Sequence, residues 1–349
     1  MKDKTIGFAI VGTGSIAENH AKAIAAVEGA ELRAVFNRNP DKARSFAAHY
    51  PAEVERELPG LLQRRDVDVV CITTPTGAHA EIALPAFEAG KHVLCEKPLD
   101  INIQRTEQMI KSAEKNRRIL ACVFQSRFGK GAQTVKKAIE AGRFGRLTLC
   151  NVQTRWWRTQ EYYDEGGWRG TWDLDGGGAL MNQGIHGVDL LQWLVGMPEA
   201  VHAFAATLAH HGIETEDTLL ANLKYSSGAL GSIECATSAY PGFARTIEIS
   251  GSRGSAFLKD DTITTWEFVD ELPGDDEIRN AEADSQLKSG ASDPKAITTY
   301  GHQKHVEDLV QAIRDNAPVA IPGTEGRNAV ALIEAIYRST RSGQIEPVT

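Results

Sequence analysis

The sequence lacks the features that mark a membrane protein, a disulfide scaffold or a nucleic-acid-binding protein. Its 349 residues contain no apolar run long enough to cross a bilayer, and no apolar export segment stands at the start. The net charge of -8 leaves no basic excess for nucleic acid. The five cysteines are odd in number and scattered, and several lie in apolar, strand-like runs. We therefore expect a cytoplasmic protein with reduced cysteines, no bound metal, and neither nucleic acid nor membrane as a partner.

The first third of the chain alternates short apolar strands with amphipathic helices. The expected strands lie at 6–11, 32–36, 67–73, 92–95 and 119–124, and the expected helices at 18–28, 41–49 and 78–89. This alternation is typical of a parallel sheet that is covered by helices on both faces. We predict that residues 1–124 form an α/β domain of the Rossmann type.

A glycine-rich turn follows the first strand and opens the first helix. In the run from Gly12 to Ala17, Gly12 permits a tight turn and Gly14 lets the backbone approach a pyrophosphate. The small Ala17 allows close packing of the helix on the strand. A glycine turn without a ligand is the alternative, and the strand–turn–helix context favours the dinucleotide.

The end of the second predicted strand bears on the choice between NAD and NADP. An acidic residue there would hold the ribose hydroxyls of NAD, but this chain has Asn37 followed by Arg38. An asparagine can bind a ribose without repelling a 2′-phosphate, and an arginine can pair with one. Arg38 could instead be a solvated surface side chain. The sequence therefore allows either NAD or NADP as the cofactor and slightly favours NADP.

From residue 125 onward the patterns are β-rich. Strands are predicted at 148–155, 202–208, 218–225, 229–236, 245–250 and 254–259, with helices at 305–315 and 329–339. We predict that residues 125–349 form an α+β domain with an open, mostly antiparallel sheet, whose free face joins copies into a homodimer or homotetramer. The acidic segment 273–292 is predicted to be a mobile loop.

Two clusters in this second part carry chemistry. Asn182, His186 and Asp189 share one face of a helix that is otherwise apolar, where polar groups must find partners or face a cavity. Aromatic and arginine side chains crowd into residues 155–172, and such groups pack on sugar rings and bind carboxylate or diphosphate. The alternatives are a hydrogen-bonded core seam for the first cluster and a core or subunit interface for the second.

Taken together, these motifs resemble the Gfo/Idh/MocA oxidoreductases over essentially the whole chain. The matching residues are Gly12 to Ala17, Glu96-Lys97-Pro98, Gly176-Gly-Gly, and Asn182-x-x-x-His186-x-x-Asp189. The resemblance implies the two-domain architecture predicted above, with Lys97 and His186 flanking the reacting carbon. Relatives often carry a carboxylate at the position of Asn182, so an acid–base role for that position does not follow.

Residues 157–172 and Met181-Asn182-Gln183 resemble family members that oxidise the 3-hydroxyl of a UDP-aminouronic acid, although those members usually keep an acid at the position of Asn37. The expected catalytic residues are Lys97, His186 and Asn182. The expected cofactor contacts are Gly12, Thr13, Gly14, Ser15, Ile16, Asn37, Arg38, Thr74, Pro75, His79, Glu96, Lys97 and Gln125. The expected substrate contacts are Lys97, Arg127, Tyr163, Arg169, Asn182, His186 and His302.

The resulting hypothesis is an NAD(P)-dependent dehydrogenase that oxidises a secondary hydroxyl of a sugar or sugar nucleotide. His186 acts as the general base and Lys97 stabilises the developing alkoxide, or Lys97 is itself the base. Asp189 orients the His186 ring or caps a backbone donor. Three alternatives stay open: a cyclitol or free-sugar dehydrogenase, an NAD-dependent glycoside hydrolase with transient oxidation, and a non-catalytic dinucleotide sensor.

Overall fold

The computed structural model describes residues 4–165, 167–281, 290–291 and 298–349, which fall into two units. The first unit takes its described residues from Met1–Gln125 and Thr298–Arg327, and the second from Ser126–Ile297 and Asn328–Thr349. The sequence analysis predicted one boundary, between residues 124 and 125, which places 298–327 in the second domain. In the structure, residues 298–327 belong to the first unit. Within the described residues, no helix combines the length and the apolar character that crossing a bilayer requires.

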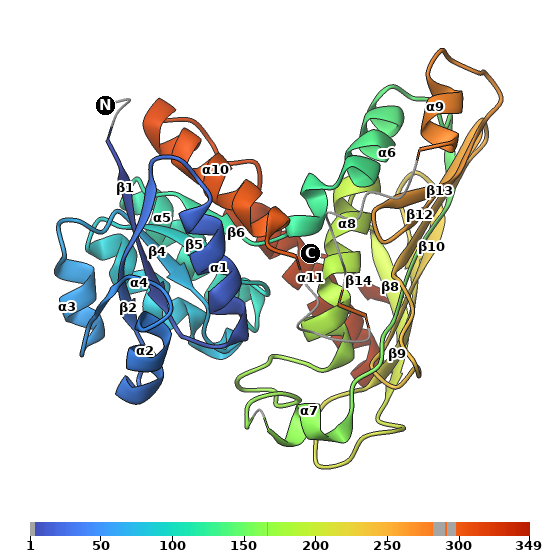
Figure 1. Ribbon diagram of the computed structural model, residues 1–349. Helices are drawn as coiled ribbons and strands as arrows, with labels where there is room; N and C mark the ends of the chain where they lie inside the picture. The colour runs from blue at the N-terminus through green and yellow to red at the C-terminus, as the bar shows by residue number, and fades with distance from the viewer. Residues whose placement is uncertain (1–3, 166, 282–289, 292–297) are drawn as a thin grey trace. The chain divides into compact units, whose positions relative to one another are not determined.

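The first unit is built on a parallel sheet with the strand order β3-β2-β1-β4-β5-β6 (Figure 1). Its strands are β1 (Ile6–Val11), β2 (Ala30–Phe36), β3 (Glu53–Val54), β4 (Val69–Ile72), β5 (His92–Cys95) and β6 (Leu120–Cys122). Every residue of β1 is buried, as expected for a central strand with helices on both faces. The strand order reverses between β1 and β4, which is where ligands bind in sheets of this type. This confirms the predicted Rossmann architecture.

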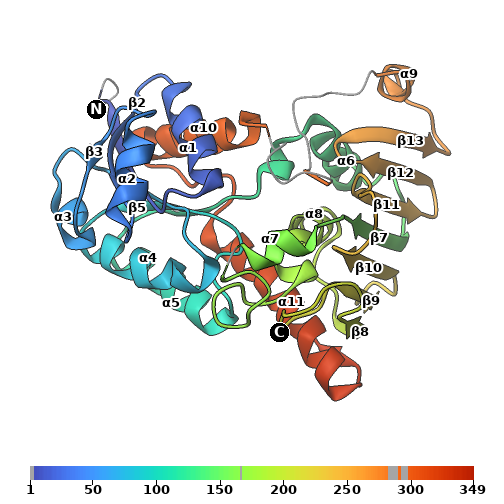
Figure 2. The same cartoon turned by 60° about the horizontal axis from the view of Figure 1, so that its bottom comes forward.

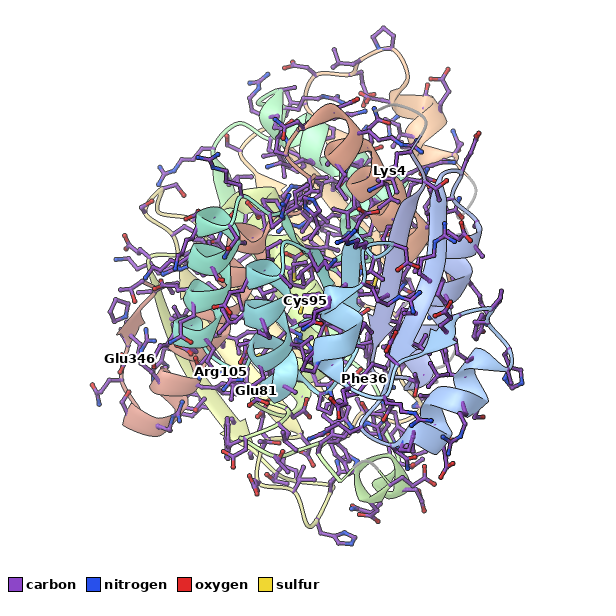
Figure 3. The ribbon with its side chains drawn as sticks, turned by 90° about the vertical axis from the view of Figure 1, so that its left-hand side faces the viewer. Lys4, Phe36, Glu81, Cys95, Arg105 and Glu346 are labelled. Carbon is purple, nitrogen blue, oxygen red and sulfur yellow. The ribbon has the colours of Figure 1, made fainter. Side chains whose placement is uncertain are left out.

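Helices cover the two faces of this sheet. They are α1 (Ser15–Ala25), α2 (Pro40–Ala47), α3 (Leu58–Gln63), α4 (His79–Glu88) and α5 (Ile103–Lys115), with a short 3₁₀ turn η1 at Thr76–Ala78. The side chain of Asn39 caps α2 by accepting from the backbone amides of Asp41 and Lys42, as Asn often does at this position. The helices α4 and α5 pack together, and Figure 3 labels Glu81 of α4 and Arg105 of α5. Nη2 of Arg105 lies 3.9 Å from Oε1 of Glu81.

The helix α10 (Tyr300–Asp315) explains why residues 298–327 belong to the first unit. Its apolar face, including Val306, Leu309 and Val310, is part of the same buried core as α1 and the sheet. The helix also begins five residues earlier than the sequence predicted, so that His302 lies in its first turn rather than before it.

The second unit is built on a mixed, mostly antiparallel sheet with the order β13-β12-β11-β7-β10-β9-β8-β14, whose strands lie side by side in Figure 2. They are β7 (Leu147–Arg155), β8 (Ala200–Ala206), β9 (Thr218–Lys224), β10 (Leu230–Ala236), β11 (Thr246–Gly251), β12 (Gly254–Lys259), β13 (Thr262–Phe268) and β14 (Glu346–Pro347). Only the pairing of β10 with β7 is parallel among the described strand pairs of this sheet. The open α+β prediction is confirmed, although β13 and β14 were not predicted.

The helices α6 (Lys130–Glu140) and α8 (Ile185–Val195) and the π-helical segment η3 (Ala179–Gly184) pack on one face of this second sheet. The other helical segments are α7 (Gln160–Asp164), α9 (Asp275–Arg279), which contacts β13, and η2 (Gln125–Phe128) and α11 (Gly323–Ser342), which both begin in the first unit. On the other face, alternate side chains are exposed: in β9, Leu219 and Ala221 are buried but Leu220 is 54% exposed. This alternation is the signature of a sheet with one covered and one open face.

Two further expectations can be checked against the fold. All five cysteines are buried and none forms a disulfide, as predicted. The predicted loop at 273–292 is wrong for its first part, because residues 275–279 form α9. There the buried carboxylate of Asp275 pairs with Arg143 at 2.7 Å and accepts from the indole of Trp266. Residues 282–289 and 292 lie outside the described part of the chain.

Candidate active site

The glycine turn after β1 leaves room for a ligand at the start of α1. Gly12 has a φ of 98°, and a Cβ on it would lie 2.8 Å from the carbonyl oxygen of Thr73, so both conformation and space demand glycine. Gly14 is the N-cap of α1, and a Cβ on Gly14 would meet nothing within 4 Å. Ala17 is fully buried against the sheet. An open backbone at a helix N-terminus is the arrangement that binds a pyrophosphate.

Asn37 stabilises this glycine turn by hydrogen bonding. Its amide nitrogen donates to the hydroxyl of Thr13 at 2.8 Å, and its amide oxygen accepts from the backbone of Asn39 at 2.9 Å. Arg38 beside it is exposed. The sequence analysis did not foresee this local role of Asn37, and its contact with a ribose stays a prediction.

The loops that follow β4 and β5 are tied together by His79. This buried imidazole lies 3.0 Å from the carbonyl oxygen of Thr74 through Nε2 and 3.0 Å from that of Pro98 through Nδ1. The Lys97–Pro98 peptide bond is cis. His79 therefore holds the Thr74-Pro75 loop against the Glu96-Lys97-Pro98 loop, both at the carboxyl edge of the sheet.

Two predicted cofactor contacts carry buried polar atoms that lack a hydrogen bond within the described residues. These atoms are the hydroxyl of Thr74 and the amide oxygen of Gln125, and Gln125 packs against Gly301 of α10. Buried polar groups in native proteins are almost always paired, so both atoms are available to hydrogen-bond a ligand. Together with the open space at Gly14, they are compatible with a bound dinucleotide, and the contacts of Thr74 and Gln125 with it stay predictions.

Glu96 is the centre of a buried cluster in the first unit. Its Oε1 accepts from Nε2 of His20 at 2.9 Å and from Nε2 of His302 at 3.2 Å, while its Oε2 accepts from the backbone amide of Lys97. Burial opposes ionisation of Glu96, but the hydrogen bonds from the two histidines outweigh it and hold the carboxyl pKa well below its usual value. Burial likewise lowers the pKa of His20. Glu96 is therefore held as a carboxylate between the imidazoles of His20 and His302.

The side chain of His302 is only 1% exposed and its Nε2 lies 3.2 Å from Oε1 of Glu96. Its predicted contact with substrate stays a prediction. His20 was missed by the sequence analysis. The signal was available, since His20 lies on the buried face of α1 with Ala17, Ala21 and Ile24, where a polar residue needs a partner.

In the second unit, the predicted α-helical seam is partly a π-helix. Asn182 lies in η3, whereas His186 lies in the first turn of α8 and is 6% exposed. Single π-helical turns inside helices are frequent at functional sites. Buried Glu216 stabilises the start of η3 by accepting from the backbone amides of Leu180 at 2.8 Å and Gly178 at 3.2 Å. The sequence analysis did not predict this role for Glu216.

Asp189 forms a buried, bidentate ion pair with Arg127. The guanidinium donates through Nε at 2.9 Å and through Nη2 at 2.6 Å, and the Arg127 and Asp189 side chains are 4% and 1% exposed. The pair joins η2 to α8. This burial favours a structural role for Arg127 over the predicted substrate contact, and it supplies Asp189 with a partner that the sequence analysis did not predict.

The aromatic and arginine segment is densely packed within the second unit. The hydroxyl of Tyr163 bonds to that of Thr237 at 2.7 Å, and Tyr163 is 7% exposed. The guanidinium of Arg169 lies 4.3 Å from the ring centroid of Tyr162 and donates to the Tyr162 carbonyl oxygen at 3.0 Å. Both groups are thus held by neighbours, and their predicted contacts with substrate stay predictions.

Comparison with known proteins agrees with this geometry. Residues 6–124 match the model of an oxidoreductase family with an NAD-binding Rossmann fold, and residues 132–257 match the GFO/IDH/MocA C-terminal domain. The solved structure of the WlbA dehydrogenase from Bordetella pertussis, in complex with NADH and UDP-GlcNAcA, is 36% identical. The match covers 100% of this chain and 99% of that one, with a TM-score of 0.91.

The chain belongs to the Gfo/Idh/MocA family of oxidoreductases. Within this family it also resembles an inositol 2-dehydrogenase of Rhizobium meliloti, at 29% identity over 96% of this chain and 97% of the relative. An NADP(+)-dependent scyllo-inositol 2-dehydrogenase of Bacillus subtilis is 29% identical over 89% of each chain. The Gfo/Idh/MocA relatives therefore differ in both substrate and cofactor.

Proposed function

We propose that this protein oxidises a secondary hydroxyl of a sugar nucleotide, with a UDP-aminouronic acid as the substrate class. The observation that carries the proposal is the chain-long, 36% identical match to a dehydrogenase whose structure holds NADH and UDP-GlcNAcA. A cyclitol is the second candidate, supported by the inositol dehydrogenases among the relatives.

A nicotinamide cofactor, when bound, supplies the hydride acceptor for the proposed reaction. His186 takes the proton of the reacting hydroxyl, since an imidazole titrates near neutral pH, and Lys97 donates a hydrogen bond to the developing alkoxide. Lys97 and His186 belong to different units, and their joint action rests on the family resemblance. Asn182 orients a neighbouring hydroxyl.

The chain's own residues would hold the dinucleotide. The backbone of Gly12 to Ile16 would bind the pyrophosphate at the start of α1, and Thr74 and Gln125 offer the unpaired polar atoms already described. Arg38 follows a strand end that has no carboxylate, so we propose that NADP is accepted alongside NAD.

The variant Arg38→Ala tests this proposal. It should weaken NADP binding and leave NAD binding unchanged, and titration calorimetry would measure both affinities.

The decisive assay mixes the protein with NAD⁺ or NADP⁺ and records formation of the reduced cofactor. UDP-GlcNAcA, a free uronic acid, myo-inositol and an aryl glycoside would be tested separately. Fastest turnover with UDP-GlcNAcA supports the proposal, and fastest turnover with myo-inositol supports the cyclitol alternative. Cleavage of the glycoside without net reduction would support the hydrolase.

His186→Asn tests the proposed base. Removing a general base costs about a hundredfold or more in turnover, so a near-normal rate would refute the role of His186. The matched control is His211→Asn, because His211 is an exposed histidine of the same unit and should keep full activity.

We also propose that the open face of the second-unit sheet joins copies of the chain. On this face Phe204 of β8 is paired with Leu220 of β9, and Leu230 of β10 with Leu149 of β7, each between 47% and 66% exposed. Exposed large apolar side chains gathered on one face favour association. Analytical ultracentrifugation should show an oligomer that Leu220→Lys dissociates, whereas a wild-type monomer would refute the proposal.

A further inference from the structure

A chain of hydrogen bonds in the second unit runs from a cation to an anion through two side-chain amides. Nη2 of Arg158 donates to Oε1 of Gln183 at 2.9 Å, and Nε2 of Gln183 donates to Oδ1 of Asn182 at 2.8 Å. Nδ2 of Asn182 then donates to Oδ1 of Asp175 at 2.6 Å. The four residues come from three separate segments, since Arg158 follows β7, Asp175 precedes η3, and the two amides lie within η3.

The charges at the two ends determine the orientation of both amides. A flipped Gln183 would present its NH₂ group to the guanidinium of Arg158, and a flipped Asn182 would present its carbonyl to the carboxylate of Asp175. The second hydrogen of the Gln183 NH₂ group is also used, because Nε2 donates to the hydroxyl of Tyr162 at 2.9 Å. Each hydrogen bond therefore joins one donor to one acceptor, and every donor lies on the Arg158 side of its acceptor.

Both charged ends are themselves buried and held. Arg158 is 3% exposed, and its Nη1 donates to the carbonyl oxygens of Trp157 at 2.7 Å and Ala291 at 3.0 Å. Asp175 is 1% exposed, and its Oδ2 accepts from the backbone amide of Gly170 at 2.9 Å. A buried charge is costly unless it is paired and hydrogen-bonded. The two amides between them supply a hydrogen-bond acceptor to the guanidinium of Arg158 and a donor to the carboxylate of Asp175.

Asn182 is the member of the chain that reaches the surface. Arg158, Gln183 and Asp175 are buried, whereas Asn182 is only partly buried and lies four residues before His186. We propose that Asp175 and Arg158 are positioning residues, which fix the amide of Asn182 in one orientation for a substrate hydroxyl. This inference rests on the proposed sugar oxidation, and it assigns to Asp175 a role in substrate recognition without contact to the substrate.

An exchange of the amide and the carboxylate tests the proposal. Asn182→Asp alone places a second carboxylate beside Asp175, where Nδ2 of Asn182 now lies 2.6 Å from Oδ1 of Asp175. One of the two carboxylates must then bind a proton, so turnover acquires a new pH dependence. Asp175→Asn alone brings two NH₂ groups together and frees Asn182 to turn. The double variant restores every bond of the chain, because the new carboxylate at position 182 would accept from Gln183 and from the new amide at position 175.

The expected results separate stability from recognition. Each single variant should lower the unfolding temperature, because the hydrogen bond between positions 182 and 175 is lost. Each should also raise the sugar KM about two- to tenfold, the effect of losing one neutral hydrogen bond to the substrate, while the dissociation constant of NADH stays unchanged. The double variant should recover the unfolding temperature but not the sugar KM, since position 182 no longer holds an amide. The matched control, Asp173→Asn, changes an exposed carboxylate of the same loop and should behave as wild type.

Three outcomes would overturn the inference. They are an unchanged sugar KM in Asp175→Asn, full recovery of the sugar KM in the double variant, and a double variant less stable than either single one. If the wild-type protein turns over none of the sugars or inositols, the proposed function fails instead. In that case the unfolding temperatures of the single and double variants at positions 175 and 182 still test the chain of hydrogen bonds.

Discussion

The buried ion pair between Arg127 and Asp189 allows a quantitative prediction. Removing one partner of such a pair leaves an uncompensated buried charge, which costs about 3–5 kcal/mol of folding free energy. Both partners are almost completely buried and the pairing is bidentate, so Arg127→Met and Asp189→Ala should each fall in this range. The double variant removes both charges of this pair and should be no less stable than either single variant.

Urea unfolding of the four proteins would measure this cycle, followed by tryptophan fluorescence and by circular dichroism. Coincident transitions are required before a free energy is extracted, because the chain has two units. If the double variant loses the sum of the two single losses, the side chains act independently and the reasoning about the pair is refuted.

The same double variant decides between the two roles of Arg127. A charge-assisted hydrogen bond to the substrate is worth about 1.5–3 kcal/mol, so its loss would raise the sugar KM about tenfold or more. The buried pairing predicts instead that the well-folded double variant keeps its sugar KM. A large increase in KM without loss of stability would restore Arg127 as a substrate contact.

Three further predictions concern groups around the site. Burial raises the pKa of Glu216 to about 7, so the stability from its protonated form is present at acidic pH and lost as the pH rises through about 7. Glu216→Gln should flatten this part of the stability curve in thermal melts, and an unchanged curve would contradict the assignment. Glu96→Ala leaves two buried imidazole donors unpaired at about 1–3 kcal/mol each, and calorimetric unfolding should show that Glu96→Gln costs less. His79→Leu unties the two loops at the sheet edge and should weaken NADH binding about tenfold by fluorescence titration, whereas equal affinity would show that the loops hold without it.

Local sequence patterns predicted much of the fold because they depend on neighbouring residues. Gly12 and Gly14 after an apolar strand predicted a helix there, although α1 begins at Ser15 rather than at residue 18. The periodicity of the chain predicted β1, β4 and most strands of the second sheet. The π-helical turn of η3 was not predictable in this way. Glu216 accepts from the backbone amides of Gly178 and Leu180 at the start of η3, and it comes from another part of the chain.

The sequence by itself determined the motifs, the parallel and antiparallel sheets, and the family, since these follow from spacing and from residue type. Only the tertiary structure showed that Glu96 lies between two histidines that are distant along the chain. It likewise paired Asp189 with Arg127, and Asn182 with Asp175. Burial and long-range hydrogen bonding select these partners, and a linear pattern of polar residues does not record which of them will meet.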